Sequence, residues 1–357
     1  MKKVTKSLIA SVVAAAMVGT LGAAAQAKEI KLTASSSHPP IVPWVKTIQD
    51  LVVPEANKRL EKMGSPHRIK WTEAYAGALY NFQNTLEGIE QGLGDIGWVG
   101  TLWEPIKMPL HNVTYYAPFA AFDVMQLREI ATDMEKVPEV AAEWTKYNTK
   151  FLGAQVADSY QLMTKKPITK VEEIEGLKLI TPGAISAMVR GTGAIPVDAG
   201  LPVFYNNMQT GVADGCIIIT TGMLPFKLHE VAPYITRVNL GAVNSGALAM
   251  NMDTWKSLPK DVQEVFTGLG VDYSKTVAER VAAFEKVSFG KLPTLGAKLS
   301  EMSEAERKRW AAKLPNIAGE WAADLEKKGV PGKAIVAKFM EAVRARGGQP
   351  LRDWDKE

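Results

Sequence analysis

The feature that most constrains the fold is an alternation of short apolar runs with helical patterns between Val171 and Thr236. The run LKLIT at 177–181 predicts a strand that ends at Pro182-Gly183, and residues 184–190 then predict a helix. A second short strand is predicted at 193–197, a helix at 203–211, and a strand buried on both faces at 216–219. Strands alternating with helices indicate an α/β architecture, in which ligands bind at the carboxyl ends of the strands.

Several segments in this region and around it carry a family signature. They are GLKLITPG at 176–183, GAIPV at 193–197, YNNMQTGVADG at 205–215 and KLHEVAPYIT at 227–236. The segments LEGIEQGLGDIG at 86–97, YQLMTKKPI at 160–168 and ALAMNMDTWKSLPKDVQEVF at 247–266 fit the same frame. In this order and spacing, the chain resembles the periplasmic substrate-binding subunits of tripartite ATP-independent periplasmic (TRAP) transporters, the DctP-like family.

The resemblance implies an α/β, two-lobed periplasmic binding protein fold of type II-like form, with the ligand cleft between the lobes. Residues 28–154 plus 244–285 are expected to form lobe I, and 155–243 plus 286–357 lobe II with the C-terminal helices. The chain would cross between lobes at 151–156 and return at 238–243 and 247–252, and these crossings would act as a hinge. The partners implied are a small organic solute and the membrane permease subunits.

The remaining elements are predicted from periodicity and turn residues. Strands are predicted at 29–36, 68–75, 95–99 and 115–119, and helices at 44–63, 84–92 and 124–134. A long inter-lobe helix is predicted at 259–288, after a Ser-Leu-Pro start signal, and amphipathic helices at 301–346 with a break at 329–332.

The first 27 residues have the pattern of a secretory signal. Three lysines precede the apolar run 8–21, and Ala25-Gln26-Ala27 offers a cleavage site before Lys28. The sequence therefore predicts Sec-type export to the periplasm with cleavage after Ala27. The single cysteine, Cys216, leaves no internal disulfide, so the core must hold the exported chain together.

Composition and spacing argue against nucleic-acid binding and catalysis. Removing the three signal lysines from 42 basic residues leaves 39 against 38 acidic ones, which is close to neutral, and no basic patch with aromatics stands out. No metal-ligand spacing, nucleophile motif or cofactor motif is found around the four histidines, so no metal or cofactor is predicted. An exported enzyme is the less favoured alternative to a binding receptor.

The chain departs from its relatives at positions that usually contact the ligand. In the family, an arginine of the G-L-K-I-R-x-P-G motif pairs with a substrate carboxylate, and here that position is Ile180. The family's E-N-P contributes an asparagine, and here the three positions read Ile217-Ile218-Ile219. Some sugar-acid binders carry another arginine where this chain has Tyr160. A typical dicarboxylate is therefore not expected, because its charge would be buried without a cation.

The candidate lining combines aromatic and aliphatic side chains with a few polar ones. The predicted site residues are His38, Tyr75, Trp98, Trp103, Glu104, Asp158, Tyr160, Ile180, Ile218 and Asn244. Aromatic faces beside a carboxylate favour a small amine or amino alcohol, through cation–π contact and charge pairing. Without a directed carboxylate, the same lining suits an aromatic or neutral ligand. An arginine from elsewhere, such as Arg190, would restore binding of a carboxylate.

Overall fold

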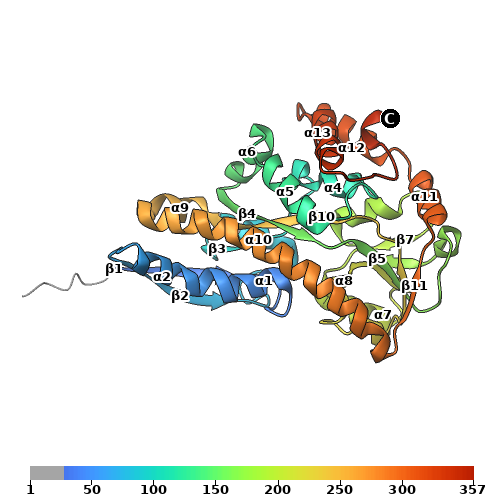
Figure 1. The fold of residues 1–357 in the computed structure, drawn as a ribbon, viewed down its shortest axis with the longest axis horizontal. Coiled ribbons are helices and arrows are strands. Elements are labelled where there is room, and N and C mark those ends of the chain that lie inside the picture. The colour runs from blue at the N-terminus through green and yellow to red at the C-terminus, as the bar shows by residue number, and fades with distance from the viewer. Residues whose placement is uncertain (1–27) are drawn as a thin grey trace, which may run out of the picture.

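Two β-sheets form the framework of the protein (Figure 1). The computed structural model describes residues 28–357, so the predicted signal segment and its cleavage site lie outside the described residues. The first sheet, sheet A, has the order β2-β1-β3-β10-β4, and the second, sheet B, has the order β11-β9-β5-β8-β6-β7. The strands of sheet A are β1 (Lys28–Ser35), β2 (His67–Ala74), β3 (Ile96–Val99), β4 (Thr149–Ala157) and β10 (Val243–Asn251). Those of sheet B are β5 (Tyr160–Thr164), β6 (Lys178–Ile180), β7 (Ile195–Val197), β8 (Gly215–Ile219), β9 (Tyr234–Arg237) and β11 (Lys298–Glu301).

Both sheets mix parallel and antiparallel pairs. In sheet A, β1 runs parallel to β2 and β3, while β10 runs antiparallel to β3 and β4. In sheet B, β6 runs parallel to β7 and β8, and β5 runs antiparallel to β8 and β9. Every residue of β8 is buried, which explains why its sequence is an apolar run instead of an alternating pattern.

Two short crossings join the sheets. The strand β4 of sheet A leads into β5 of sheet B through Asp158 and Ser159, and β9 returns to β10 through residues 238–242. The crossings are fastened to each other, because the Tyr160 N–H donates to the Gly241 carbonyl at 3.2 Å and the Leu240 N–H to the Tyr160 carbonyl at 3.0 Å. The Gly241 N–H also donates to the Ser159 hydroxyl at 3.0 Å. The two-lobed arrangement is thus confirmed.

Helices cover the sheets and connect the lobes. They are α1 (Pro43–Thr47), α2 (Val53–Lys62), α3 (Thr85–Glu90), α4 (Val113–Tyr116), α5 (Val124–Met134), α6 (Pro138–Lys146), α7 (Phe204–Gln209), α8 (Thr220–Met223), α9 (Met252–Ser257), α10 (Lys260–Lys291), α11 (Glu304–Lys313), α12 (Ile317–Glu326) and α13 (Gly332–Ala345). The long helix α10 contacts α1, α2 and β4 on one lobe and α8 on the other, as Figure 1 shows. The predicted inter-lobe helix is confirmed, and no helix within residues 28–357 has the length and apolar character of a membrane span.

Two local predictions were wrong. The predicted strand at 115–119 is the short helix α4, because Pro109 opens a helical turn at 109–112 that leads directly into it. Phe119 then has a left-handed φ of 59° and donates its N–H to the Leu240 carbonyl, which ends any extended run. The predicted helix at 184–190 is a 3₁₀ segment, Gly183–Val189.

The C-terminal helices pack at one end of the molecule. Helix α12 contacts α4, and α13 contacts α4 and α5. The Trp354 indole N–H donates to the Pro118 carbonyl at 2.7 Å, so the final residues are fixed to the same region. The exact boundaries of the lobes stay a prediction.

Candidate ligand cleft

A small cleft lies between the two sheets, with a free volume of about 40 Å³. One wall comes from sheet A and its loops, with His38, Trp44, Trp98, Leu102, Trp103 and Ser245. The other wall comes from sheet B and its loops, with Tyr160, Pro182, Ile185, Leu201, Phe204, Ile217, Ile218 and Ile219. The cleft therefore depends on both lobes.

Three tryptophans surround the His38 ring. Its centroid lies 5.1 Å from that of Trp98, 5.8 Å from Trp44 and 6.0 Å from Trp103, which stacks on it. Trp98 enters this group from β3, and Trp44 from α1, which begins after the His38-Pro39-Pro40 loop. The result is a rigid wall of aromatic faces and edges.

The lining of the cleft carries no net charge. It contains no Asp, Glu, Lys or Arg side chain from residues 28–357. Its one histidine is His38, which is 1% exposed, and burial lowers its pKa to about 4. His38 is therefore neutral at neutral pH, and its Nδ1 lies 3.0 Å from the Ser37 hydroxyl.

Hydrogen-bond donors are present in this apolar setting. The Trp98 indole N–H donates to Gln155 Oε1 at 2.9 Å, and the Ser245 hydroxyl donates to the same oxygen at 2.8 Å. By contrast, the indole nitrogens of Trp44 and Trp103 are buried without a hydrogen-bond partner among the described residues. A buried donor without an acceptor costs about 1–3 kcal/mol, so these two N–H groups favour a ligand with acceptor oxygens.

Glycines permit close contact between the lobes at the edge of the cleft. A Cβ on Gly183 would lie 2.4 Å from the Leu102 carbonyl oxygen, and one on Gly200 would lie 2.4 Å from the Phe82 ring. Gly183 and Gly200 follow strands of sheet B, whereas Leu102 and Phe82 belong to loops beside sheet A. The lobes are thus closed on each other, and Gly183 also has a left-handed φ of 53° that suits glycine.

Five of the predicted site residues line the cleft: His38, Trp98, Trp103, Tyr160 and Ile218. Asp158 does not, although it is fully buried between β4 and β5. Its carboxylate accepts the Thr221 N–H at 3.1 Å and the Thr221 hydroxyl at 2.6 Å, so it holds the first turn of α8. Burial raises its pKa to about 6 against the opposing effect of these hydrogen bonds.

The other four predicted residues lie outside the lining. Ile180 is buried within β6, where it pairs with Val197 and Cys216. Tyr75 is half-buried in the loop after β2, and Glu104 is buried at the end of the 101–103 turn. Burial, reinforced by Glu87, raises the pKa of Glu104 to about 7. Asn244 lines a separate small cavity beside α5.

Sequence reasoning missed several lining residues and one residue that positions them. Trp44 was assigned only to a helix, and Phe204 only to a helical pattern, although both follow loops at the strand ends. Gln155, which joins Trp98 to Ser245, gives no signal in the sequence because a glutamine in a strand has no characteristic spacing. Arg190 does not restore a cation to the cleft, since its guanidinium pairs with Glu320 at 2.7 Å.

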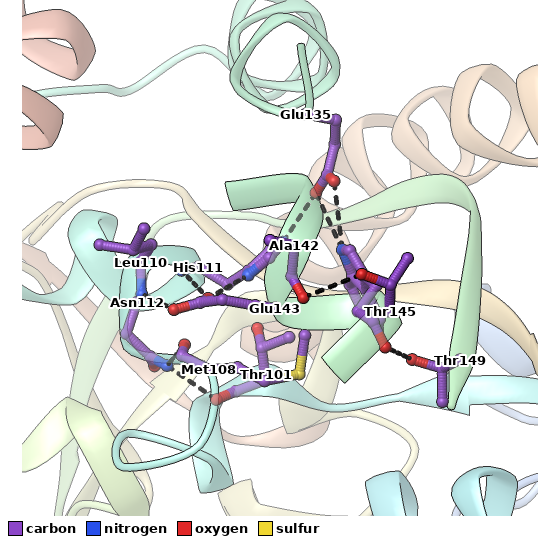
Figure 2. A network of polar contacts seen from close by, with 11 residues as sticks. Thr101, Met108, Leu110, His111, Asn112, Glu135, Ala142, Glu143, Thr145 and Thr149 are labelled. Atoms are coloured by element: carbon purple, nitrogen blue, oxygen red, sulfur yellow. Dashed lines mark hydrogen bonds and ion pairs between the residues drawn. The ribbon is translucent and has the colours of Figure 1, made fainter. Parts of the chain in front are cut away.

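A second buried histidine lies outside the cleft, in the polar network of Figure 2. His111 Nδ1 lies 2.7 Å from Glu143 Oε2, and its Nε2 lies 2.8 Å from Glu135 Oε1. Burial alone would lower the pKa of His111, but the two carboxylates outweigh it and raise the pKa to about 9. The Trp144 indole N–H also donates to Glu135, at 3.1 Å. No cluster of three potential metal ligands is found among residues 28–357, and this network reads as a structural clamp on α5 and α6.

Two lobes joined by short crossings, a long bracing helix and a cleft between them define a two-lobed solute-binding protein. A family model described as "bacterial extracellular solute-binding protein, family 7" (DctP) matches residues 45–324. The chain belongs to this family, which confirms the predicted class of solute-binding protein in place of an enzyme.

Individual relatives are distant. A solute-binding protein of Albidiferax ferrireducens is 27% identical over 149 residues, which cover 41% of this chain and 44% of that protein. The matched stretch therefore spans less than half of the relative's length. A TRAP solute-binding protein of Rhodoferax ferrireducens T118, solved with copurified benzoate, has a TM-score of 0.79 at 19% identity and covers 89% of this chain and 98% of its own. A marine metagenome protein solved with 3-hydroxybenzoate has a TM-score of 0.79 at 20% identity, covering 89% and 99%. These structures confirm the predicted fold.

Proposed function

We propose that this protein is the periplasmic solute receptor of a TRAP-type secondary transporter. In this proposal the signal segment directs export, the cleft captures a small solute as the lobes close, and the closed form delivers it to the membrane permease. The family membership and the two-walled cleft support this role. A ligand shifts the balance between open and closed forms only by its differential affinity for them, so the residues on both walls must contact it.

The ligand that the geometry supports best is an uncharged, mainly apolar or aromatic molecule that carries hydrogen-bond acceptor oxygens. The observation that carries this proposal is the lining, in which no described side chain bears a charge at neutral pH. A carboxylate placed there would lose hydration without a cationic partner. The unpartnered indole N–H groups of Trp44 and Trp103 would donate to a carbonyl, ether or hydroxyl oxygen. The two similar structures that hold benzoate and 3-hydroxybenzoate support the idea that a cleft of this fold accommodates one aromatic ring.

A small amine or amino alcohol, which the sequence favoured, is the second candidate. The rings of Trp44, Trp98, Trp103, Tyr160 and Phe204 in one lining offer faces for cation–π contact. The carboxylate proposed to assist, that of Asp158, is bound by Thr221, and Glu104 lies outside the lining. We therefore place the amine behind the neutral ligand.

The test is a thermal-shift comparison on residues 28–357 with ligands matched in shape. Each ring scaffold is supplied as an amide, a carboxylate and a methylamine, for example benzamide, benzoate and benzylamine. A ligand held at 100 times its dissociation constant stabilises the folded protein by about 2.7 kcal/mol. We expect the neutral members to raise the melting temperature most. A rise confined to amines would establish the second candidate, and a rise confined to carboxylates would contradict the uncharged cleft.

A matched pair of variants locates the binding. Trp103→Ala removes a half-buried lining ring and should abolish the shift, whereas Trp255→Ala removes a half-buried ring on α9, beside Lys150 and away from the cleft. Equal loss in both variants would mean that the shift does not come from the cleft.

A further inference from the structure

A second groove, lined mainly by polar side chains, lies beside the two crossings between the lobes. Arg237 at the end of β9, Glu285 of α10, and Arg307 and Lys308 of α11 line it, together with Ser159 and Asn239. Ser159 belongs to the first crossing between the lobes, and Asn239 to the second. This groove shares no lining residue with the ligand cleft.

Arg307 is held in place without a counter-charge. Its guanidinium lies over the Phe122 ring at 5.2 Å, and its Nε is buried with no hydrogen-bond partner among residues 28–357. The two nearby glutamates are occupied, because Glu301 pairs with Arg237 at 2.5 Å and Glu304 pairs with Lys308 at 2.6 Å. Burial lowers the pKa of Arg307, but an arginine starts so far above neutrality that the guanidinium stays charged.

Arg237 contributes a second guanidinium to the same groove. Its guanidinium lies over the Phe289 ring at 4.5 Å, and its Nη1 donates a hydrogen bond to the Glu301 carboxylate. Its Nε is also buried and has no hydrogen-bond partner within the described part of the chain. Two guanidinium groups, both positioned by aromatic rings and both with an unused N–H, form a recognised arrangement for binding oxyanions.

We propose that this groove is a second binding site, specific for a small oxyanion that Arg307 and Arg237 hold between α11 and β9. The anion would satisfy the two buried Nε–H groups and offset the charge of Arg307. The arginines would prefer sulfate, phosphate or carboxylate to chloride, because a guanidinium matches two oxygens of one group. The site goes beyond the receptor role and does not depend on the identity of the solute in the cleft.

Glu285 gives this site a dependence on pH. Burial and, to a lesser extent, the Asp158 carboxylate raise the pKa of Glu285 to about 7 against the opposing effect of Arg237. The charged groups of the groove around it are Arg237 from β9 and Glu304, Arg307 and Lys308 from α11. The carboxylate of Glu285 repels an anion above pH 7 and becomes neutral below it, so oxyanion binding should strengthen as the pH falls from 8 to 6.

Calorimetric titration of sulfate into residues 28–357, at constant ionic strength set with chloride, tests the site. Sulfate is chosen because its own charge does not change between pH 6 and 8. We expect saturable binding with one site per chain, weakened at least about tenfold in Arg307→Met. The control is Arg309→Met on the same helix, whose guanidinium pairs with Glu172 and Glu306 and does not line the groove. It should bind sulfate as the parent protein does.

Two further variants separate this proposal from the one on the cleft. Trp103→Ala should keep sulfate binding intact, because Trp103 lies in the cleft and not in the groove. Glu285→Gln should bind sulfate equally at pH 6 and pH 8. Sulfate that acts no differently from chloride, or equal binding by Arg307→Met and the parent protein, would overturn the site. Loss of sulfate binding in Trp103→Ala would place the anion in the cleft instead.

Discussion

Two histidines in this protein are buried to almost the same extent, yet at neutral pH one is expected to be neutral and the other positively charged. His38 is 1% exposed and His111 is 3% exposed. The wall around His38 consists of aromatic rings, and burial lowers its pKa to about 4. Two carboxylates clamp His111, and its pKa is about 9.

The difference shows that the neighbours, not the burial, decide the state of a buried histidine. The clamp around His111 pairs one imidazolium with two carboxylates, and it joins elements within one lobe. The cleft around His38 holds no ionised group, which leaves it open to a ligand of matching polarity. Changes to either environment test this contrast.

The largest expected effect comes from removing the charge of the clamp. His111→Leu would leave the buried carboxylates of Glu135 and Glu143 facing each other without a cation, which should cost about 3–5 kcal/mol of unfolding free energy. Urea denaturation measures this loss. His38→Leu is the matched control, and because it removes a neutral ring with one modest hydrogen bond, it should cost about 1 kcal/mol. Equal losses in the two variants would mean that His111 is not charged in the folded protein.

The next effect is on the pH dependence of stability. His111 binds its proton more tightly when folded, so its contribution is fully present below pH 6.5 and is lost as the pH rises through about 9. The pKa of His38 is lowered on folding, so its contribution is present above pH 6.5 and is lost as the pH falls through about 4. Each histidine then changes the free energy of unfolding by roughly 3 kcal/mol across its pH range, given a pKa shift of this size.

Melting temperatures measured from pH 4 to pH 9.5 show both effects. His111→Leu should flatten the curve on the alkaline side, and His38→Leu should flatten it on the acid side. If His111→Leu left the alkaline side unchanged, another group would account for the loss there.

The smallest effect concerns the hydrogen bond to His38. Ser37→Ala removes the hydroxyl 3.0 Å from Nδ1 and should lower stability by about 1 kcal/mol. Since burial is the cause of the lowered pKa, His38 should still titrate well below 6.5 when followed by NMR of the ring nitrogens. The contrasting variant is Glu135→Gln. It removes a carboxylate that raises the pKa of His111, so the pKa of His111 should fall. A return of His38 to an ordinary pKa in Ser37→Ala would show that the hydrogen bond, not burial, sets its state.

The sequence predicted the elements whose own pattern decides their structure. Helix α5 begins and ends where the apolar periodicity placed it, at Val124 and Met134, and α10 differs from its predicted range by one residue at the start and three at the end. The segment 115–119 failed because aromatic residues favour a strand only where a neighbouring strand is available, and here the preceding turn makes the chain helical.

The cleft was harder to predict than the fold. Trp98, Trp103 and Tyr160 were placed in it because they follow strands or motifs, and they do line it. Asp158 and Glu104 were included for their charge, but whether a carboxylate faces a cleft or holds a nearby turn depends on its rotamer and neighbours, which sequence spacing does not contain. The network of Glu135, His111 and Glu143 joins residues 24 and 32 positions apart and has no local pattern at all.

In the proposed receptor role, the contact between the lobes at Gly183 and Gly200 has a consequence for the timing of transport. Apart from the half-buried Trp103, the lining side chains are almost inaccessible to water in this arrangement, with Trp98 at 1%, Ile218 at 4% and Tyr160 at 5% exposure. A solute inside cannot leave until the lobes separate, so its dissociation rate cannot exceed the rate at which the lobes open. Solutes of different affinity would then all be released through the same opening step. The permease would control their release by holding the lobes apart.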